Sequence, residues 1–276
     1  MANIKELDPS SSPRAAYGAL LRKHRDEQGF SQGQLGRRMG YSSTHVSSVE
    51  TARKMPTLHF SRMADTALGT GEKFQNEWRK LRFGILLEGF PEYAQHEGKA
   101  VEIRLYEIGI IPGLVQTPEY ARCLADSAVR RGAITASQAD DRVAVLEDRQ
   151  KALVRPRSPM MLVVMDESCI RREVGGLEVM RAQLDRLLEF ADQPNTVLQI
   201  APFSIGERRT FDLPVNLLTL PDLSVLAYGE SQIRGYLERE SASVLDLLRD
   251  YHQLQAEALP HAASVDLIRE VRKAFS

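Results

Sequence analysis

The stretch GFSQGQLGRRMGYSSTHVSSVE at residues 29–50 contains two short helical patterns, each preceded by a serine. Ser31 and Ser42 stand where a serine hydroxyl can accept a hydrogen bond from an exposed backbone amide of the first helical turn. Gly40 lies between the two patterns, where a left-handed backbone turn is easy only for glycine. The stretch therefore predicts two helices that are joined by a tight turn.

The second of these segments, residues 43–50, has two faces of different character. Val46 and Val49, at positions i and i+3, place an apolar stripe toward the core, and Gly36 in the first segment lets the two helices cross closely. The opposite face carries short polar side chains with a histidine beside them, namely Ser43, Thr44, Ser47, Ser48 and His45. Such a face suits the reading of base edges in the major groove of DNA; an ordinary helical hairpin with a solvated face is the alternative interpretation.

Further helical patterns surround this stretch. One begins near Ala15 and ends before Gly29, another lies at residues 58–68, and a fifth runs from Glu72 to about Leu87. We predict a disordered lead-in at residues 1–14 and an all-α helix-turn-helix domain of about five helices at residues 15–71. A connector helix at residues 72–98 and a larger domain at residues 99–276 follow.

Charge is distributed unevenly along the chain. The net charge is −1, which by itself does not favour a nucleic-acid binder. Residues 1–80 hold 13 of the 36 basic and 8 of the 37 acidic residues, a balance of +5, whereas the remainder holds 23 and 29, a balance of −6. This asymmetry favours a basic DNA-facing module on an acidic body, and chance partitioning of the charges is the alternative explanation.

Residues 15–70 resemble the lambda-repressor-like, xenobiotic-response-element (XRE) class of helix-turn-helix regulators. The resemblance rests on five short motifs: Gly29-Phe30-Ser31-Gln32, Leu35, Met39-Gly40-Tyr41-Ser42, Val46-Ser47-Ser48-Val49-Glu50 and the basic loop Arg53-Lys54-Met55-Pro56. The family often pairs an arginine of its first helix with the glutamate that closes its third helix, and Arg25 and Glu50 stand at those two places.

The resemblance also implies DNA contacts at particular positions. It implies that Ser43, Thr44 and Ser48 contact base edges. It also implies that Gln32 contacts a phosphate and that the loop with Arg53 and Lys54 binds the DNA backbone. Ser42, His45 and Ser47, on or beside the same face, complete the predicted DNA-binding residues. Because family members often carry Gln, Arg or Asn where this chain has hydroxyls, we expect specificity to depend on bound water, DNA shape or His45.

From about residue 99 the pattern changes to a mixture of strands and helices. Val101, Ile103 and Leu105 alternate with polar residues, as in a half-buried strand. The other predicted strands are residues 160–165, 196–201, 214–220 and 224–228, and the predicted helices are residues 118–131, 137–153, 176–192, 241–259 and 264–275. Because the strands are grouped late, with helices before and after them, we predict an α+β domain with a mostly antiparallel sheet rather than a doubly wound one.

Four motifs of this larger region resemble an uncharacterised domain that is found in many actinobacterial regulators of the same helix-turn-helix class. They are YEIGIIPGLVQTPEYA, LEDRQ, RREVGG and AYGE, at residues 106–121, 146–150, 171–176 and 227–230. The resemblance covers about residues 75–275 and implies an antitoxin-like regulator that is accompanied by a small partner protein. It implies no binding role for any of these residues.

The sequence shows no nucleophile elbow, zinc-protease helix, P-loop or dinucleotide fingerprint, and its histidines lack metal-ligand spacing. We therefore predict no enzyme activity, no cofactor and no metal. Asp166-Glu167 allows a catalytic carboxylate pair, but a helix cap is the simpler interpretation, and Cys169 is interpreted as a core residue rather than a reactive thiol. A group of arginines either forms ion pairs or binds an anion: Arg142, Arg149, Arg155, Arg157, Arg171 and Arg172.

The sequence also predicts a cytoplasmic location. Cys123 and Cys169 are the only cysteines, too few for a disulfide framework. No apolar run approaches the roughly 18–20 residues of a membrane span, and the first residues lack the apolar core of a signal peptide.

The leading hypothesis is a sequence-specific regulator that binds the major groove of a near-palindromic operator in double-stranded DNA as a homodimer. Its larger domain would sense a ligand or a partner protein. An alternative is an antitoxin-like interaction module that sequesters a small partner protein, with DNA binding for autoregulation. A third hypothesis is an enzyme that acts on a small anionic molecule.

Overall fold

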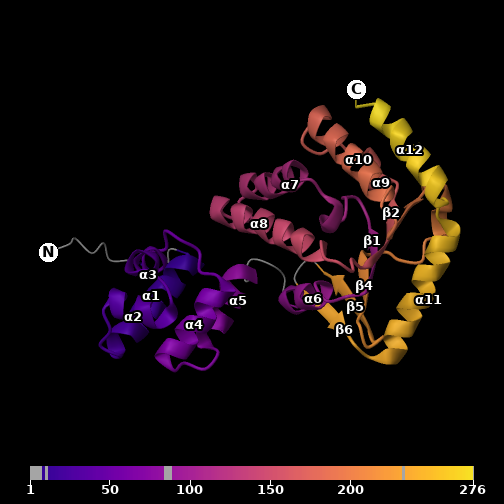
Figure 1. Ribbon diagram of the computed structural model, residues 1–276. Helices are drawn as coiled ribbons and strands as arrows, with labels where there is room; N and C mark the ends of the chain where they lie inside the picture. The colour runs from indigo at the N-terminus through magenta and orange to yellow at the C-terminus, as the bar shows by residue number, and fades with distance from the viewer. Residues whose placement is uncertain (1–7, 10–11, 84–88, 232–233, 276) are drawn as a thin grey trace. The chain divides into compact units, whose positions relative to one another are not determined.

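The computed structural model describes residues 8–9, 12–83, 89–231 and 234–275. The chain divides into two compact units, residues 1–85 and 86–276, each with its own apolar core (Figure 1). Most of the predicted lead-in lies outside the described residues, and the first helix begins at Pro13.

The first unit is all-α in its described part, as predicted. Its helices are α1 (Pro13–Glu27), α2 (Gln32–Met39), α3 (Ser43–Glu50), α4 (Leu58–Leu68) and α5 (Lys73–Phe83). The predicted caps are present, because Ser31 Oγ accepts from the backbone amide of Gln34 at 3.2 Å while the Gln34 carboxamide oxygen accepts from the backbone amide of Ser31 at 2.7 Å. The second cap is Ser42, whose Oγ accepts from the amide of His45 at 3.1 Å.

Two glycines shape the turn and the crossing of α2 and α3. Gly40 adopts the left-handed conformation with φ 74° and ends α2. A Cβ atom on Gly36 would lie 2.6 Å from the carbonyl oxygen of Tyr41, so α2 lies close to the turn that leads into α3. A third glycine was not predicted: a Cβ on Gly18 of α1 would lie 2.7 Å from the carbonyl oxygen of Val49, so α1 and α3 also cross closely.

The core of the first unit is formed by all five helices. Leu21, Leu35, Val46, Phe60 and Phe74 are fully buried there, one from each helix. Buried Asp65 of α4 accepts hydrogen bonds from the first backbone amides of α5, for example that of Phe74 at 2.8 Å. This bond fixes α5 to the four preceding helices.

The described residues of the predicted connector, 72–98, belong to two helices. Helix α5 belongs to the first unit and α6 (Phe90–Glu97) to the second. Gly89 begins α6 with φ 90°, a conformation that favours glycine and interrupts a continuous helix. The end of the predicted connector helix, residues 84–87, lies outside the described residues.

The second unit contains a six-stranded mixed sheet in the order β3-β2-β1-β4-β5-β6. Its strands are β1 (Glu102–Glu107), β2 (Met160–Asp166), β3 (Thr196–Ala201), β4 (Val215–Thr219), β5 (Val225–Glu230) and β6 (Gly235–Glu238). Three strand pairs are antiparallel, which confirms the α+β class, while β1 pairs β2 and β2 pairs β3 in parallel. The two parallel pairs arise because helices cross over between their strands.

The helices of the second unit cover both faces of this sheet (Figure 1). Besides α6 they are α7 (Pro118–Arg130), α8 (Ala136–Leu153), α9 (Ser168–Arg171), α10 (Leu177–Ala191), α11 (Ser241–Glu257) and α12 (His261–Lys273), with short 3₁₀ turns at Gly113–Val115 and Phe203–Arg208. Each predicted helix and strand of this region is present within a few residues of its predicted bounds.

Alternation along the strands gives the two faces of the sheet different partners. Tyr106 and Leu217 pack in one cluster with Tyr251 of α11, and the Tyr251 hydroxyl donates to the carbonyl of Leu162 at 2.7 Å. Neighbouring strand residues point to the other face, toward α7 and α8. Strand β6 was not predicted, because residues 231–240 are mostly polar and show no apolar alternation.

Candidate nucleic-acid interface

Helix α3 presents short polar side chains on the side opposite its buried stripe. Val46 and Val49 are buried as predicted, with exposed fractions of 0% and 1%. An open hollow of about 290 Å³, which we call the α3 hollow, lies on the polar side; it is lined by Gln32, Ser43, Thr44, Ser47, Ser48 and Arg53. The structure therefore brings together six of the predicted DNA-binding residues from α2, α3 and the following loop.

The hydroxyls of the α3 hollow differ in whether they form a hydrogen bond with the backbone of α3. Ser48 Oγ donates to the backbone carbonyl of Thr44 at 2.8 Å, so its lone pairs remain available as acceptors. Ser43 and Thr44 are exposed in the first turn of α3. Small, exposed hydroxyls at the start of a helix can contact base edges or bound water without a large loss of side-chain entropy.

A buried ionic network holds α1, α2 and α3 together beneath this surface. Arg25 Nε donates to Glu50 Oε1 at 2.6 Å and Arg25 Nη2 to Glu50 Oε2 at 3.0 Å, the pair that the family resemblance implies. Gln32 Nε2 donates to the same Oε2 at 2.7 Å. Glu50 is fully buried, and its hydrogen bonds raise the pKa of Arg25. The network positions Gln32 at the N-terminus of α2, beside the α3 hollow.

The loop that follows α3 is held by hydrogen bonds to the end of that helix. The backbone amides of Arg53 and Lys54 both donate to the carbonyl of Ser48, at 2.9 and 3.0 Å. Arg53 Nε donates to Thr51 Oγ1 at 3.0 Å, and Trp78 Nε1 ties the loop to α5 through the carbonyl of Pro56 at 3.0 Å. Both basic side chains are exposed on a fixed backbone.

Three predicted DNA-binding residues do not line the hollow. Ser42 Oγ serves as the α3 cap, and Lys54 lies one residue beyond the hollow's rim. The His45 ring stacks on Phe60, with ring centroids 5.4 Å apart and planes at 12°, and its Nε2 is buried without a hydrogen-bond partner. Burial, and next the charge of Lys54, lower the pKa of His45. The structure thus gives His45 a packing role, because the i, i+4 spacing places it on the side of buried Val49.

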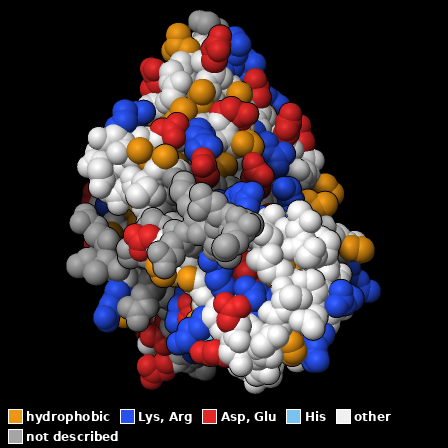
Figure 2. Space-filling model, turned by 90° about the vertical axis from the view of Figure 1, so that its left-hand side faces the viewer, with side chains coloured by type: hydrophobic (Ala, Val, Ile, Leu, Met, Phe, Trp, Pro, Cys, Tyr) orange, Lys and Arg blue, Asp and Glu red, His pale blue; other side chains and the backbone are white. Residues whose placement is uncertain are grey.

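Basic side chains of α2 are exposed on the surface of the first unit. Arg37 and Arg38 are exposed in the last turn of α2, and Arg38 lies over the Phe30 ring at 4.3 Å. On the face drawn in Figure 2, Lys and Arg side chains are interspersed with Asp and Glu, and apolar side chains are scattered among them. Attraction to phosphate is therefore expected from particular residues rather than from a broad basic surface.

The other candidate sites of the sequence have structural partners. Asp166 Oδ1 accepts from the amide of Ser168 at 2.9 Å, and Glu167 binds Arg171 at 2.6 Å, the pattern of a strand-end turn that begins a helix. Cys169 is buried, and burial raises the pKa of its thiol, which disfavours the reactive thiolate.

In the described ranges, no group of three or more His, Cys, Asp or Glu side chains is placed to hold a metal ion. No helix within the described parts of the chain has both the length and the apolar composition that crossing a bilayer requires.

Comparison with known families agrees with this geometry. Residues 16–75 match a family described as a helix-turn-helix domain. Residues 90–270, more than half of the chain, match a family described as a domain of unknown function (DUF5753), so the chain belongs to that family. No curated protein and no solved structure matches the chain.

Proposed function

We propose that the protein is a sequence-specific transcription regulator of the XRE class that inserts α3 into the major groove of double-stranded DNA. The α3 hollow carries the proposal, because it combines exposed hydroxyls on a short helix with Arg53 and the N-terminus of α2. The match of residues 16–75 to a helix-turn-helix domain supports it independently. The Arg25–Glu50 pair supports the XRE class, because it occurs at the two places that the resemblance implies.

In this account different residues contact the bases and the phosphates of the DNA. Ser43, Thr44 and Ser48 contact base edges, and Ser47 and Ser42 lie at the margin of the same surface. Gln32, Arg53 and Lys54 contact phosphates, and these contacts position the helix without reading sequence. Hydroxyls both donate and accept, so each discriminates bases weakly, and we propose that ordered water and DNA shape supply part of the specificity.

We further propose that the regulator binds as a homodimer. One short recognition helix contacts few base pairs, and two copies on half-sites about one helical turn apart supply the missing specificity. The operator is then a near-palindrome. The second unit would sense a ligand or a small partner protein, the role that its resemblance to antitoxin-like domains of actinobacterial regulators suggests. A regulator of this kind acts on the chromosome, so we propose a cytoplasmic location.

The test is selection of fragments from a library of host promoters by the wild type and by the Ser43→Ala/Thr44→Ala/Ser48→Ala variant. We expect the wild type to enrich a few fragments with paired half-sites and the variant to enrich none. Thr66→Ala, which removes an exposed hydroxyl from α4, is the matched control and should select as the wild type does. Equal selection by the triple variant and the wild type would contradict base reading by α3. Enriched fragments with single half-sites would contradict the dimer.

A further inference from the structure

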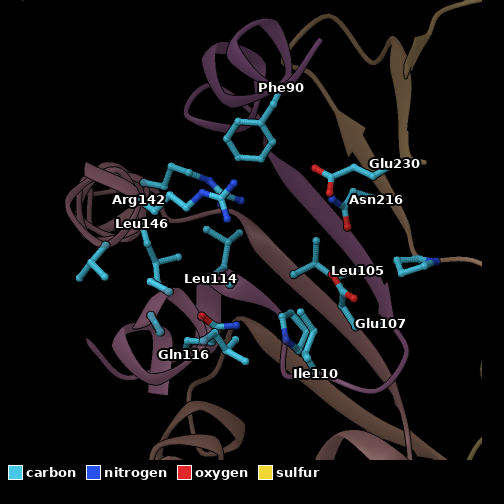
Figure 3. A pocket seen from close by; sticks show the side chains of 18 of the residues that line it. Phe90, Leu105, Glu107, Ile110, Leu114, Gln116, Arg142, Leu146, Asn216 and Glu230 are labelled. Atoms are coloured by element: carbon cyan, nitrogen blue, oxygen red, sulfur yellow. The ribbon is translucent and has the colours of Figure 1, made fainter. Parts of the chain in front are cut away.

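A pocket of about 990 Å³ lies inside the second unit, between one face of the sheet and helices α6, α7 and α8 (Figure 3). This volume is at the upper end of the range of about 300–1,000 Å³ for small-molecule sites. Most of its wall is apolar, including Phe90 from α6, Leu114 from the turn after β1 and Leu146 from α8. An apolar wall of this size can bury most of a drug-sized ligand.

The polar groups of this pocket are concentrated on its strand side. Figure 3 shows Glu107, Asn216 and Glu230 on that side, opposite Arg142 and Leu146 of α8. They come from three adjacent strands, β1, β4 and β5. Neighbouring strands lie about 4.8 Å apart, so glutamates on β1 and β5 are about 10 Å apart at the backbone, and their long side chains can converge on one small group between them.

Two of these polar side chains form no hydrogen bond or salt bridge with another described side chain, namely Glu107 and Asn216. No Lys or Arg of the described residues forms a salt bridge with Glu107, whose carboxylate accepts from its neighbour's amide at Ile108. No described residue hydrogen-bonds the Asn216 carboxamide, although the side chain is half-buried. Glu230 is exposed, and its Oε1 accepts from the Tyr228 hydroxyl at 2.8 Å, which leaves its second oxygen available to a ligand. Half-buried polar groups of this kind are expected to have partners.

Among the described residues, none of the three arginines that line the pocket forms a salt bridge with Glu107 or Glu230, although the charge of Arg149 opposes the rise in the pKa of Glu107. Arg149 donates to both oxygens of Glu97, at 2.7 and 2.8 Å, and lies over the Phe90 ring at 4.8 Å, so its charge is matched by a partner outside the strand side. Arg131 is exposed and donates to Ser127 Oγ at 2.8 Å. Arg142 on the opposite wall has an interaction of its own within the protein. The strand side therefore has two carboxylates without a salt bridge, opposite a wall that is mostly apolar and also carries arginines.

We propose that this pocket binds an amphipathic organic cation whose ammonium group lies between Glu107 and Glu230 and donates to Asn216 Oδ1. The apolar body of the ligand lies against Phe90, Leu114 and Leu146. A neutral ligand of the same shape would leave Glu107 without a charged partner, and an anionic one would meet two carboxylates. This assignment rests on the proposed role of the second unit as the ligand-responsive part of a DNA-binding regulator.

The test uses the full chain without DNA and three probes of matched shape: 4-phenylbutylamine, 4-phenylbutan-1-ol and 5-phenylpentanoate. Binding is measured by isothermal titration calorimetry. Burial, and next the charge of Glu230, raise the pKa of Glu107 to about 8, so the titrations are run just above that value. The Glu107→Gln/Glu230→Gln variant preserves side-chain shape, and Glu178→Gln, an exposed glutamate of α10, is the matched control. Unfolding curves verify that each variant is folded.

We expect the amine to bind at least about tenfold more tightly than the alcohol, a difference of about 1.4 kcal/mol. We expect no binding of the carboxylate, loss of the amine preference in the double variant, and an unchanged preference in Glu178→Gln. Absence of amine binding at millimolar concentration, equal binding of amine and alcohol, or a preference that survives in the double variant would each overturn the proposal.

The same samples separate this proposal from the proposed function. Amine binding by a protein that selects no promoter fragment would support the pocket and overturn the DNA-binding role. Selective DNA binding by a protein that does not bind the amine would support the DNA-binding role and overturn the pocket proposal.

Discussion

Two glutamates, one in each unit, are enclosed by the protein in opposite ways. Glu50 is fully buried and accepts hydrogen bonds from Arg25 and Gln32, so its charge is neutralised within the fold. Glu107 faces a pocket and has no salt bridge to any described Lys or Arg. Burial and Glu230 raise the pKa of Glu107 to about 8.

The difference distinguishes a structural charge from one that is available to a ligand. A buried ion pair is costly to break, because the remaining partner keeps an uncompensated charge. An enclosed carboxylate without a cation is destabilising when ionised and gains most from a ligand that supplies one. The first unit thus carries its function on an exposed surface above a satisfied network, and the second carries an unsatisfied group inside a pocket.

The largest effect is expected from breaking the Glu50 network. Glu50→Ala leaves buried Arg25 with exposed Asp26 as its remaining carboxylate partner, and should lower the free energy of unfolding of the first unit by about 3–5 kcal/mol. Trp78 is the single tryptophan and belongs to the first unit, so its fluorescence during urea unfolding measures this unit alone. Glu107→Gln should leave the Trp78 transition unchanged. A loss below about 1 kcal/mol for Glu50→Ala would show that the network is not structural.

A smaller effect is expected from the two glycines of α2. Gly36→Ala places a Cβ 2.6 Å from the carbonyl oxygen of Tyr41 and should cost about 1–3 kcal/mol through backbone shifts. Gly33→Ala, in the same helix, meets its nearest atom at 3.8 Å and should stabilise the first unit by about 0.5–1 kcal/mol. The Trp78 transition measures both variants. Equal effects of the two substitutions would show that α2 and α3 do not cross as closely as described.

The pH dependence of stability should distinguish Glu107 from Glu50. Because its pKa is raised, Glu107 keeps a proton in the folded protein that the unfolded chain releases above pH 4.5. The contribution of Glu107 to the free energy of unfolding is therefore complete below pH 4.5 and is lost as pH rises toward about 8. The groups that face Glu107 are Glu230 on β5, Arg149 on α8, Tyr120 on α7 and Cys169 on α9. Urea midpoints of the second unit, followed by far-ultraviolet circular dichroism, should fall between pH 6 and 8, and less steeply in Glu107→Gln. Parallel slopes would contradict the assignment.

The smallest expected signal is a proton released on ligand binding. Near neutral pH an ammonium group that binds Glu107 displaces the proton from its carboxyl, up to one per ligand. The calorimetric enthalpy of 4-phenylbutylamine binding should therefore differ between buffers of different ionisation enthalpy, and this difference should vanish in Glu107→Gln. An enthalpy that is independent of buffer in the wild type would show that Glu107 does not receive the cation.

Local signals made the first unit predictable. Caps at Ser31 and Ser42, the turn at Gly40 and the small residue at Gly36 all act within a few residues, so the sequence displays them directly. Gly18 carries the same information about close packing, but its contact with α3 spans about thirty residues, and the sequence alone gives no sign of it. His45 was predicted beside the hydroxyl face, and its i, i+4 relation to Val49 directs the ring toward Phe60.

The pocket of the second unit could not be predicted in this way. Glu107, Asn216 and Glu230 come from strands that are far apart in the sequence, and each looks like an ordinary polar residue of an alternating strand. Their convergence depends on sheet order, in which β4 pairs β1 across more than a hundred residues. Strand β6 was missed for a related reason, since only its pairing with β5, and not its polar composition, makes it a strand.

The most direct test of the central claim is the salt dependence of binding to a recovered promoter fragment and to a scrambled copy. We predict that the Ser43→Ala/Thr44→Ala/Ser48→Ala variant loses its preference for the true fragment but keeps the wild-type salt slope. Arg53→Ala/Lys54→Ala should weaken binding to both fragments alike and reduce the slope by up to about two. Lys23→Ala, which removes an exposed charge paired with Glu27 on α1, should change neither quantity. Retained preference in the hydroxyl variant would contradict the claim that α3 reads the DNA sequence.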